Sequence, residues 1–265
     1  SYKKIDIQNK LISIGSLYID TLTVIEIQGD EEKVENFLQG QITSDVNSVS
    51  NDSFHLSSIC NQKGFVMAGF LLNKSNDKYK IVINRELVHI LIDELTPFAK
   101  FFGVTFMETT NYVRASVESA PFSKSIFLQN NSFGLSVKIE DDKKDIANTI
   151  SLKEWSAANM ILGNFYLSKN EAGQYRPLEI NYDIQRVSFD KGCFRGQEII
   201  ARMKYLGIDR RRFCTIISKR EIKEEKNLKI IGELIKLKDS YICLSLIKKD
   251  FLETLREEDP SLIII

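Results

Sequence analysis

The first half of the chain alternates short apolar and β-branched runs with turn residues, a pattern typical of mixed α and β structure. Residues 21–27 predict a strand, and Asp30 supplies an N-cap for a helix that runs to about residue 38. Hairpin signals then predict an antiparallel meander, which is followed by helical spacing and two more strands. These expected elements are meander strands at 54–60, 65–72 and 79–83, a helix at 86–102, and strands at 104–107 and 113–117.

The second half has two clear helices and a strand-rich end. One helix is expected over 152–162, with Ser151 as its N-cap and Gly163 as its terminator. Another is expected over 197–206, closed by Gly207. Charged turns separate three later strands, which predict a small β-barrel or sheet that begins near residue 208. These strands are expected at 213–217, 228–237 and 241–247.

The composition is typical of a soluble globular protein. The chain has 265 residues, 43% of them hydrophobic, and its 36 basic residues balance its 36 acidic ones. A net charge of zero argues against a protein that binds nucleic acid through its overall charge. No apolar run reaches the roughly 18 residues of a membrane span, and the first residues lack the apolar stretch of a secretory signal. We therefore expect a cytoplasmic protein that makes no membrane contact.

The cysteines and histidines offer little material for a metal site. The four cysteines are widely spaced and form no C-x-x-C pair: Cys60, Cys193, Cys214 and Cys243. The two histidines, His55 and His89, are too few for a His-rich centre or a Cys–His–Asp triad, and we expect them to be ordinary packed or solvent-facing residues. We therefore expect free thiols in a reducing compartment and no stably bound metal.

One cysteine has a distinctive setting, in the run Lys191-Gly192-Cys193-Phe194-Arg195-Gly196-Gln197-Glu198. The flanking basic side chains and the start of the expected helix at Gln197 favour a thiolate. The two glycines permit close approach by a ligand or a partner. Eight basic and three acidic residues between 186 and 212 give a local charge of about +5, which favours an anionic ligand. We expect a functional thiol at Cys193, the alternative being a buried cysteine that packs as a small hydrophobe.

This run resembles the K-G-C-[YF]-x-G-Q-E signature of the YgfZ family, folate-binding relatives of the glycine-cleavage T-protein. The resemblance extends to both flanks of the run, at 177–179 and 201–207. Two earlier segments resemble the same family, FLQGQITSDV at 37–46 and CNQKG at 60–64. The resembling segments lie in the family's order and cover roughly residues 22 to 212.

The resemblance implies an α+β, T-protein-like fold. In that fold, mixed α/β units form a ring around a central folate cavity, and the chain ends in a small C-terminal β-barrel. Residues 1–207 would form the ring as two interleaved units, at about 22–110 and 111–207. Residues 208–265 would form the barrel, for which this region is short.

The implied function is that of a folate-binding accessory protein for the assembly or repair of iron–sulfur cluster proteins, including tRNA-modifying enzymes. The implied cofactor is tetrahydrofolate or a derivative. The implied partners are iron–sulfur proteins or cluster-assembly factors, without direct nucleic-acid binding. The thiol of Cys193 would act together with the rest of its motif: Lys191, Gly192, Gly196, Gln197 and Glu198.

The implied folate contacts centre on the single tryptophan. Trp155 lies in a segment that resembles the family helix with a folate-contacting tryptophan, and a core position explains it equally well. A second family tryptophan is replaced here by Leu22, which predicts weaker folate binding. Candidate cations for the glutamate tail of the folate are Arg176, Lys191, Arg195 and Arg202.

Two other functions remain open at this point. A tetrahydrofolate-dependent aminomethyl or methyl transferase of the T-protein type is the first, and it is the expected class if the chain is an enzyme. In such transferases, the segment that corresponds to the Cys193 motif of this chain resembles K-x-D-F-x-G. The second is an RNA-binding module that uses the cluster Arg210-Arg211-Arg212, although no exposed aromatic residues interleave with these arginines.

Overall fold

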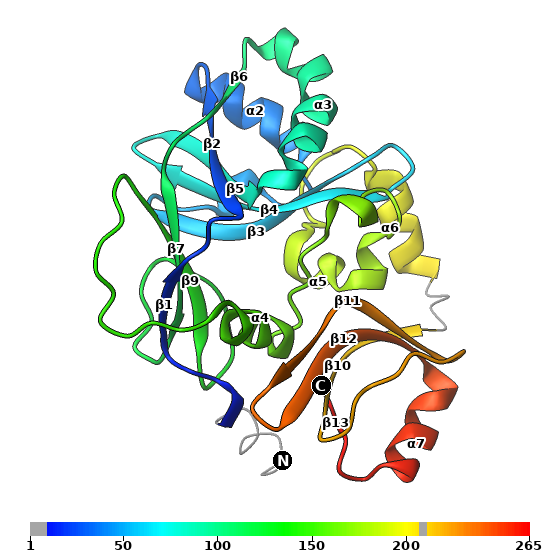
Figure 1. The fold of residues 1–265 in the computed structure, drawn as a ribbon. Coiled ribbons are helices and arrows are strands. Elements are labelled where there is room, and N and C mark those ends of the chain that lie inside the picture. The colour runs from blue at the N-terminus through cyan, green and yellow to red at the C-terminus, as the bar shows by residue number, and fades with distance from the viewer. Residues whose placement is uncertain (1–9, 207–210) are drawn as a thin grey trace.

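A computed structural model describes residues 10–206 and 211–265, which fold into three antiparallel sheets joined by helices (Figure 1). The α+β class expected from the sequence is therefore confirmed. None of the helices in these two ranges combines the length and apolar character needed to cross a membrane. Three sequence expectations lie outside the described residues: the helix end at Gly207, the region start at 208, and Arg210.

The five-stranded sheet has the order β3-β4-β5-β2-β6 and packs against two helices (Figure 1). Asp30 caps the first helix by accepting a hydrogen bond from the Lys33 N–H, as the sequence predicts. The elements are β2 (Leu22–Gln28), α2 (Glu31–Gln41), β3 (Ser53–Cys60), β4 (Val66–Ser75), β5 (Lys78–Asn84), α3 (Val88–Ala99) and β6 (Thr105–Glu108). Short 3₁₀ helices lie at Val46–Ser48, Arg85–Leu87 and Lys100–Phe102.

The second sheet has four strands in the order β1-β7-β9-β8. Its edge strand β1 pairs with a strand that follows about a hundred residues later, Gly15 opposite Val117. Helix α4 packs on this sheet, and Ser151 and Glu154 form a reciprocal capping box at its start. The elements are β1 (Gly15–Tyr18), β7 (Tyr112–Glu118), β8 (Ile126–Gln129), β9 (Gly134–Glu140) and α4 (Leu152–Ile161).

The third sheet is formed by the C-terminal region. The strands expected to make a small barrel form a four-stranded antiparallel sheet, with β11 and β13 at its two edges. A helix that the sequence pattern did not reveal, α7, follows β12. Arg211 and Arg212 open β10, and both are exposed. The elements are β10 (Arg211–Ser218), β11 (Leu228–Leu237), β12 (Ser240–Lys248), α7 (Lys249–Glu258) and β13 (Ile263–Ile264).

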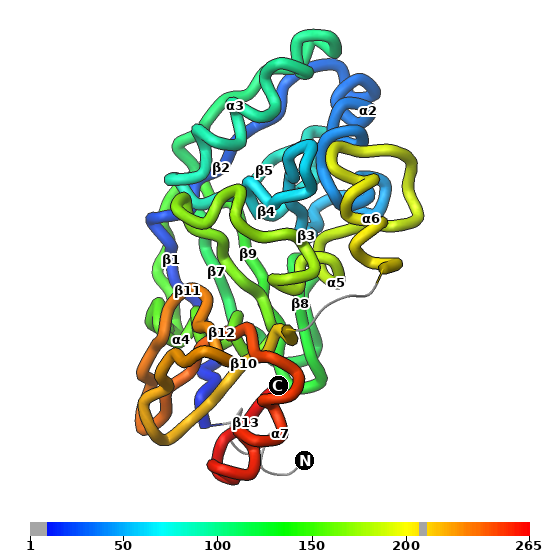
Figure 2. Tube along the Cα trace, turned by 90° about the vertical axis from the view of Figure 1, so that its right-hand side faces the viewer, coloured from blue at the N-terminus to red at the C-terminus, as the bar shows by residue number. Residues whose placement is uncertain are grey.

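The segment from 163 to 206 connects the sheets and carries the cysteine motif. Its elements are η4 (Lys169–Glu171), η5 (Pro177–Ile180), α5 (Tyr182–Arg186) and α6 (Gln197–Leu206). The buried side chain of Tyr182 anchors this segment, because its hydroxyl donates a hydrogen bond to the Phe165 carbonyl at 2.6 Å. A Cβ atom at Gly69 would lie only 2.6 Å from the Tyr182 hydroxyl, so β4 needs glycine there. Figure 2 shows α6, in yellow, at the end of this segment.

Candidate functional site

Segments that are far apart in the sequence meet at the loop that carries Cys193. The backbone N–H of Arg195 donates to the Gly40 carbonyl at 3.1 Å, which ties the loop to segment 37–46. The hairpin at 60–64 packs against the same loop. The three segments that carry the sequence resemblance therefore form one structural unit.

Two glycines make the close contact between this loop and the hairpin possible. Gly196 has a φ of +81°, and a Cβ atom there would lie 2.7 Å from the Asn61 carbonyl oxygen. Gly64 has a φ of +78°, and its Cβ atom would lie 3.0 Å from the Ile199 side chain. A side chain at either position would force the backbones apart. Gly192, in contrast, faces open space.

Lys191 fixes the cysteine loop to the end of α2. Its Nζ donates to the carbonyl oxygens of Gln39, Ile42 and Ser44 at 2.9, 2.7 and 2.6 Å. Carbonyls at the end of a helix lack partners within the helix, and a cation satisfies them well. The ammonium also lies 4.7 Å from the Phe194 ring centroid. Burial lowers the pKa of Lys191 to about 8. The three ammonium protons therefore hold backbone rather than a ligand.

Arg195 fixes the same loop to α3. Its Nη1 lies 2.7 Å from Glu94 Oε2, and its Nη2 donates to the Glu94 carbonyl at 2.7 Å. The guanidinium also stacks 4.7 Å from the Phe98 ring centroid. Burial holds the pKa of Arg195 below its usual range, and the Glu94 charge opposes that shift. The guanidinium is thus occupied within the chain, and its contact with a folate tail stays a prediction.

The Cys193 thiol is exposed in a groove of about 510 Å³ beside the start of α6. The other cysteines, Cys60, Cys214 and Cys243, are all buried. Burial raises the pKa of each of these three thiols, that of Cys243 to about 12, so they stay protonated at neutral pH. The Oε1 atom of Gln41 is buried at this groove without a partner. The lining residues are Gly40, Gln41, Gln62, Phe98, Cys193, Phe194, Arg195, Gly196, Gln197, Glu198 and Ile199.

Helix α6 places polar side chains beside the thiol. Gln197 and Glu198 open the helix and line the groove. Arg202 is 59% exposed and pairs with Glu198 at 3.1 Å, an interaction that solvent weakens. Lys204 lies 3.7 Å from the Phe189 ring centroid. Lys191 and Arg195 are thus engaged inside the chain, whereas Arg202, Arg211 and Arg212 are exposed.

A second feature is a small hollow in the middle of the molecule, between the first two sheets and the connecting segment. It measures about 20 Å³, room for about one water molecule. Tyr166 is one of the residues that line this hollow, and it is 44% exposed. The other lining residues are Leu22, Leu56, Gly69, Phe70, Leu71, Val82, Ile83, Asn84, Leu87, Val137, Leu167 and Arg186.

Arg186 is the one cationic residue that lines the hollow, and it is only 2% exposed. Its Nη1 donates to the carbonyls of Ser57 at 2.8 Å and Phe70 at 3.2 Å. Its Nη2 donates to Asn164 Oδ1 at 2.7 Å, and the guanidinium stacks 4.2 Å from the Tyr182 ring centroid. The Nε atom is buried and has no partner among the described residues.

Trp155 lies behind this hollow rather than on its wall. The ring is 3% exposed in the main core and meets Phe127 edge-on, with ring centroids 6.4 Å apart. Its side chain lies near Tyr166, which does line the hollow. The structure thus assigns Trp155 a core position, while direct contact with a folate stays a prediction.

The two histidines have different surroundings. His55 Nε2 lies 3.0 Å from Ser44 Oγ, and its Nδ1 lies 3.3 Å from Ser48 Oγ, below the turn that Lys191 holds. Burial lowers the pKa of His55 to about 4, so the ring is neutral at physiological pH. His89 lies on the exposed face of α3, where it pairs with Asp93 at 3.4 Å.

Sequence reasoning missed Tyr166 and did not separate Arg186 from the other basic residues of its segment. Tyr166 lies in a loop without periodicity, so no pattern indicates which way its ring faces. Arg186 is recognisable only from the acceptors that surround it, and these come from β3, β4 and the connecting segment.

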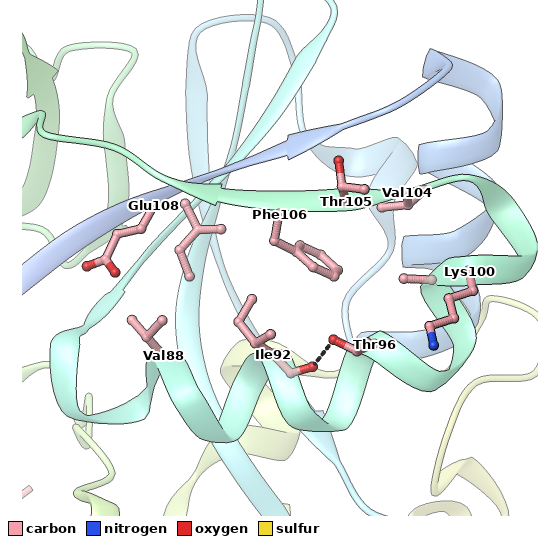
Figure 3. Close-up of a pocket in the computed structure, with 10 residues that line it drawn as sticks. Val88, Ile92, Thr96, Lys100, Val104, Thr105, Phe106 and Glu108 are labelled. Atoms are coloured by element: carbon pink, nitrogen blue, oxygen red, sulfur yellow. Dashed lines mark hydrogen bonds between the residues drawn. The ribbon is translucent and has the colours of Figure 1, made fainter.

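An apolar pocket lies elsewhere, between α3 and the edge strand β6, and measures about 460 Å³ (Figure 3). Thr96 uses its hydroxyl within the helix, donating to the Ile92 carbonyl at 2.6 Å. Glu108 and Lys100 lie at opposite ends of the pocket (Figure 3). Because no polar groups converge on a common point there, this pocket is not our candidate site.

Comparison with known proteins connects this geometry to a family, although no family model matches the chain. The tRNA-modifying protein YgfZ of Vibrio atlanticus is 26% identical over 217 residues, which cover 73% of this chain and 67% of that protein. The protein of the same name from Colwellia psychrerythraea is 28% identical over 221 residues, or 72% and 68% of the two chains. That from Photobacterium profundum is 24% identical over 241 residues, or 80% and 73%.

Among solved structures, the fold is similar to glycine cleavage system aminomethyltransferase T from Bartonella henselae. The TM-score is 0.61 at 10% sequence identity, and the match covers 94% of this chain and 82% of the other. This likeness concerns the fold alone. Together with the sequence relatives, it confirms the resemblance carried by the cysteine motif and the two N-terminal segments. The chain is thus similar in sequence to the tRNA-modifying proteins YgfZ and has the fold of the aminomethyltransferase T-protein.

Proposed function

We propose that this protein supports the assembly or repair of iron–sulfur proteins, including tRNA-modifying enzymes, through the thiol of Cys193. The observation that carries the proposal is the exposure of this thiol on a loop held by Lys191, Arg195 and two glycines. Many contacts thus hold the loop in the position that exposes the sulfur atom of Cys193. The names of the sequence relatives, tRNA-modifying proteins, supply the client class.

The proposed site needs a second molecule to complete its chemistry. Iron–sulfur clusters are usually held by about four thiolates, whereas Cys193 is the one exposed cysteine of the four in the chain. A cluster handled here would therefore take its remaining ligands from the client or from a small thiol. The groove beside Cys193 offers space for such a partner segment. A free, exposed thiol of this kind is suited to the reducing cytoplasm, where we place the protein.

We also propose that a reduced folate binds at the central hollow. The chemistry of the wall suits a heteroaromatic ring: apolar side chains such as Leu22, the open face of Tyr166 and an unpaired donor on Arg186. A bicyclic ring is larger than the one-water space, so binding requires the wall to open. That cost, together with Leu22 in place of a family tryptophan, predicts modest affinity. When bound, the folate would supply one-carbon chemistry, while the residues named here bind and orient it.

A complementation experiment tests the role of the thiol. Cells that lack this protein receive the unsubstituted chain, Cys193→Ala, Cys193→Ser or Cys214→Ala, and their tRNA nucleosides are measured by mass spectrometry. We expect both Cys193 variants to lose most of the nucleosides made by iron–sulfur enzymes. Cys214→Ala is the matched control, because it removes a buried thiol from the third sheet. Full nucleoside levels in both Cys193 variants, at normal protein abundance, would contradict the proposal.

A further inference from the structure

Strand β6 is an edge strand of the five-stranded sheet, and its outer side presents backbone hydrogen-bonding groups. Just after β6, the Thr109 N–H donates to the Val24 carbonyl at 2.9 Å, and the β2–β6 register continues from there. Bonded and non-bonded residues alternate in an antiparallel pair, so Met107 also points its backbone groups toward β2. The N–H and C=O groups of Phe106 and Glu108 therefore point away from the sheet, where they form a template for one more strand.

The pocket between β6 and α3 lies where the side chains of such a strand would point. Phe106 and Glu108 point from β6 toward α3, and side chains of the helix point back toward the strand (Figure 3). Val88, Ile92 and Thr96 are four residues apart, so they share one face of α3. A strand added beside β6, at the usual spacing of about 4.8 Å, would direct alternate side chains toward the same face. The pocket of about 460 Å³ has room for such a side chain.

The two ends of the pocket carry opposite charges (Figure 3). Lys100 is exposed at one end, and none of the ion pairs in the described part of the chain includes it. Glu108 lies at the other end, where Arg85 and Thr23 contact the same carboxylate oxygen, Oε1, at 3.4 and 3.0 Å. An occupant with an acidic group near Lys100 and a basic group near Glu108 complements both ends.

We propose that β6 and this pocket bind an extended segment of a partner protein, which adds to the sheet as a sixth, antiparallel strand. An apolar residue of the segment lies opposite Phe106 and fills the pocket. A basic residue two positions earlier lies opposite Glu108, and an acidic residue two positions later lies near Lys100. In this mode of recognition, main-chain hydrogen bonds provide affinity and pockets for alternate side chains provide specificity. A small ligand suits the site less well, because the polar groups of β6 form a row.

Helix α3 separates this surface from the cysteine loop. Glu94 and Phe98, which contact Arg195, are each two positions after a residue that lines the pocket. Two positions correspond to a rotation of about 200°, so these contacts lie on the opposite side of the helix. The proposed surface is therefore distinct from the groove at Cys193, and binding there does not depend on the thiol.

The test is a titration of the full chain with the end-blocked peptide Val-Lys-Thr-Leu-Thr-Glu-Val, followed by the anisotropy of a dye on the peptide and by amide hydrogen exchange. Saturating peptide should slow the exchange of the Phe106 and Glu108 amides by about 10-fold or more, and that of Met107 should change little. The same peptide with N-methyl groups on its lysine and leucine loses the two donors that face β6. It should bind about 10-fold more weakly or worse.

Substitutions in the protein test the pocket and its charge. Ile92→Trp fills the pocket and should weaken binding by about 10-fold or more. His89→Trp is the matched control, because it adds the same ring to the exposed side of α3, and it should bind normally. Lys100→Glu should favour a peptide in which lysine replaces the glutamate, and it tests the site at an exposed position if Ile92→Trp does not fold. Cys193→Ser should bind like the unsubstituted chain.

Several results would overturn the inference. These are no binding of the peptide at about 1 mM, equal binding of the N-methylated peptide, and equal binding by Ile92→Trp. Unchanged peptide preference in Lys100→Glu would overturn the assignment of the acidic residue. Sedimentation tests the other occupant: a dimer of the unsubstituted chain that Ile92→Trp dissociates would place a second copy on β6 in place of a partner protein.

Discussion

The cysteine loop and the central hollow both contain buried cations, but the two regions use them differently. In the loop, Lys191 meets three carbonyl oxygens and Arg195 meets the carboxylate of Glu94. In the hollow, Arg186 has a buried Nε donor without a partner in the part of the chain that the structure describes. The cations of the loop therefore have partners within the chain, and the loop exposes the thiol of Cys193. The cation of the hollow lacks a full set of hydrogen-bond partners.

This difference separates residues that hold the site from residues that meet a ligand. Hydrogen bonds that are complete within the chain contribute to folding, so removing them should lower stability. A donor that the chain leaves incomplete contributes less to folding and more to recognition. Variants in the loop should therefore change the free energy of unfolding, and variants at the hollow should mainly change ligand binding.

The largest effect is expected from Gly196→Ala. A Cβ atom there would lie 2.7 Å from the Asn61 carbonyl oxygen, and the φ of +81° is unfavourable for alanine. We expect a loss of about 3 kcal/mol in the free energy of unfolding, measured with urea. Gly192→Ala is the control, since that position faces open space, and it should change stability by less than about 1 kcal/mol. Similar losses in both variants would show that close packing on the hairpin is not what holds the loop.

A smaller loss is expected from Lys191→Met. The variant removes the ammonium donor of the carbonyls of Gln39, Ile42 and Ser44. We expect this loss to lower the free energy of unfolding by about 2 kcal/mol. Looser attachment should also change the rate at which Cys193 reacts with a small alkylating reagent. Urea unfolding and timed alkylation measure the two effects. If neither the alkylation rate nor the stability changed, the loop would not depend on Lys191, and the contrast between the loop and the hollow would be contradicted.

The pH dependence of stability sharpens the comparison through His55. Burial lowers its pKa from 6.5 to about 4, so the folded protein binds this proton less readily than the unfolded chain does. The contribution of His55 to stability is therefore present above pH 6.5 and is lost as the pH falls through 4. Urea unfolding between these values should show a shallower pH dependence in His55→Gln. Equal slopes in the two proteins would contradict a neutral, buried His55 below the turn that Lys191 holds.

The smallest effect on folding is expected from Tyr166→Phe. Tyr166 lines the hollow and is 44% exposed, so the variant should lose less than about 1 kcal/mol in the free energy of unfolding. Emission from Trp155 should nevertheless change, because the two side chains lie close together. A loss of stability as large as that of Gly196→Ala would show that Tyr166 belongs to the core and not to a binding site.

Much of the fold could be predicted because its signals are local. The sequence predicted the N-cap of α4 at Ser151 and the full extents of α6 and β11. It missed β1, since this short strand depends on a partner about a hundred residues later. It also missed α7, an amphipathic helix inside a strand-rich region.

The candidate site divides in the same way. The cysteine motif could be found because its residues are consecutive, and Gly196 has the tight backbone conformation expected of it, whereas Gly192 faces open space. The partners of Lys191 and Arg195 could not be foreseen, because the carbonyls of α2 and the carboxylate on α3 approach only in the folded chain. A local charge of about +5 favoured an anionic ligand, whereas the fold holds two of those charges, Lys191 and Arg195, within the chain.

The most direct test of the central claim is the recovery of an iron–sulfur tRNA-modifying enzyme after its cluster has been damaged by oxidation. The purified enzyme is incubated with a thiol and an iron and sulfide source, in the presence of the unsubstituted chain or of Cys193→Ser, and its activity is followed over time. The account predicts faster or fuller recovery with the unsubstituted chain and none of that gain with Cys193→Ser. Equal recovery with the two proteins would contradict it.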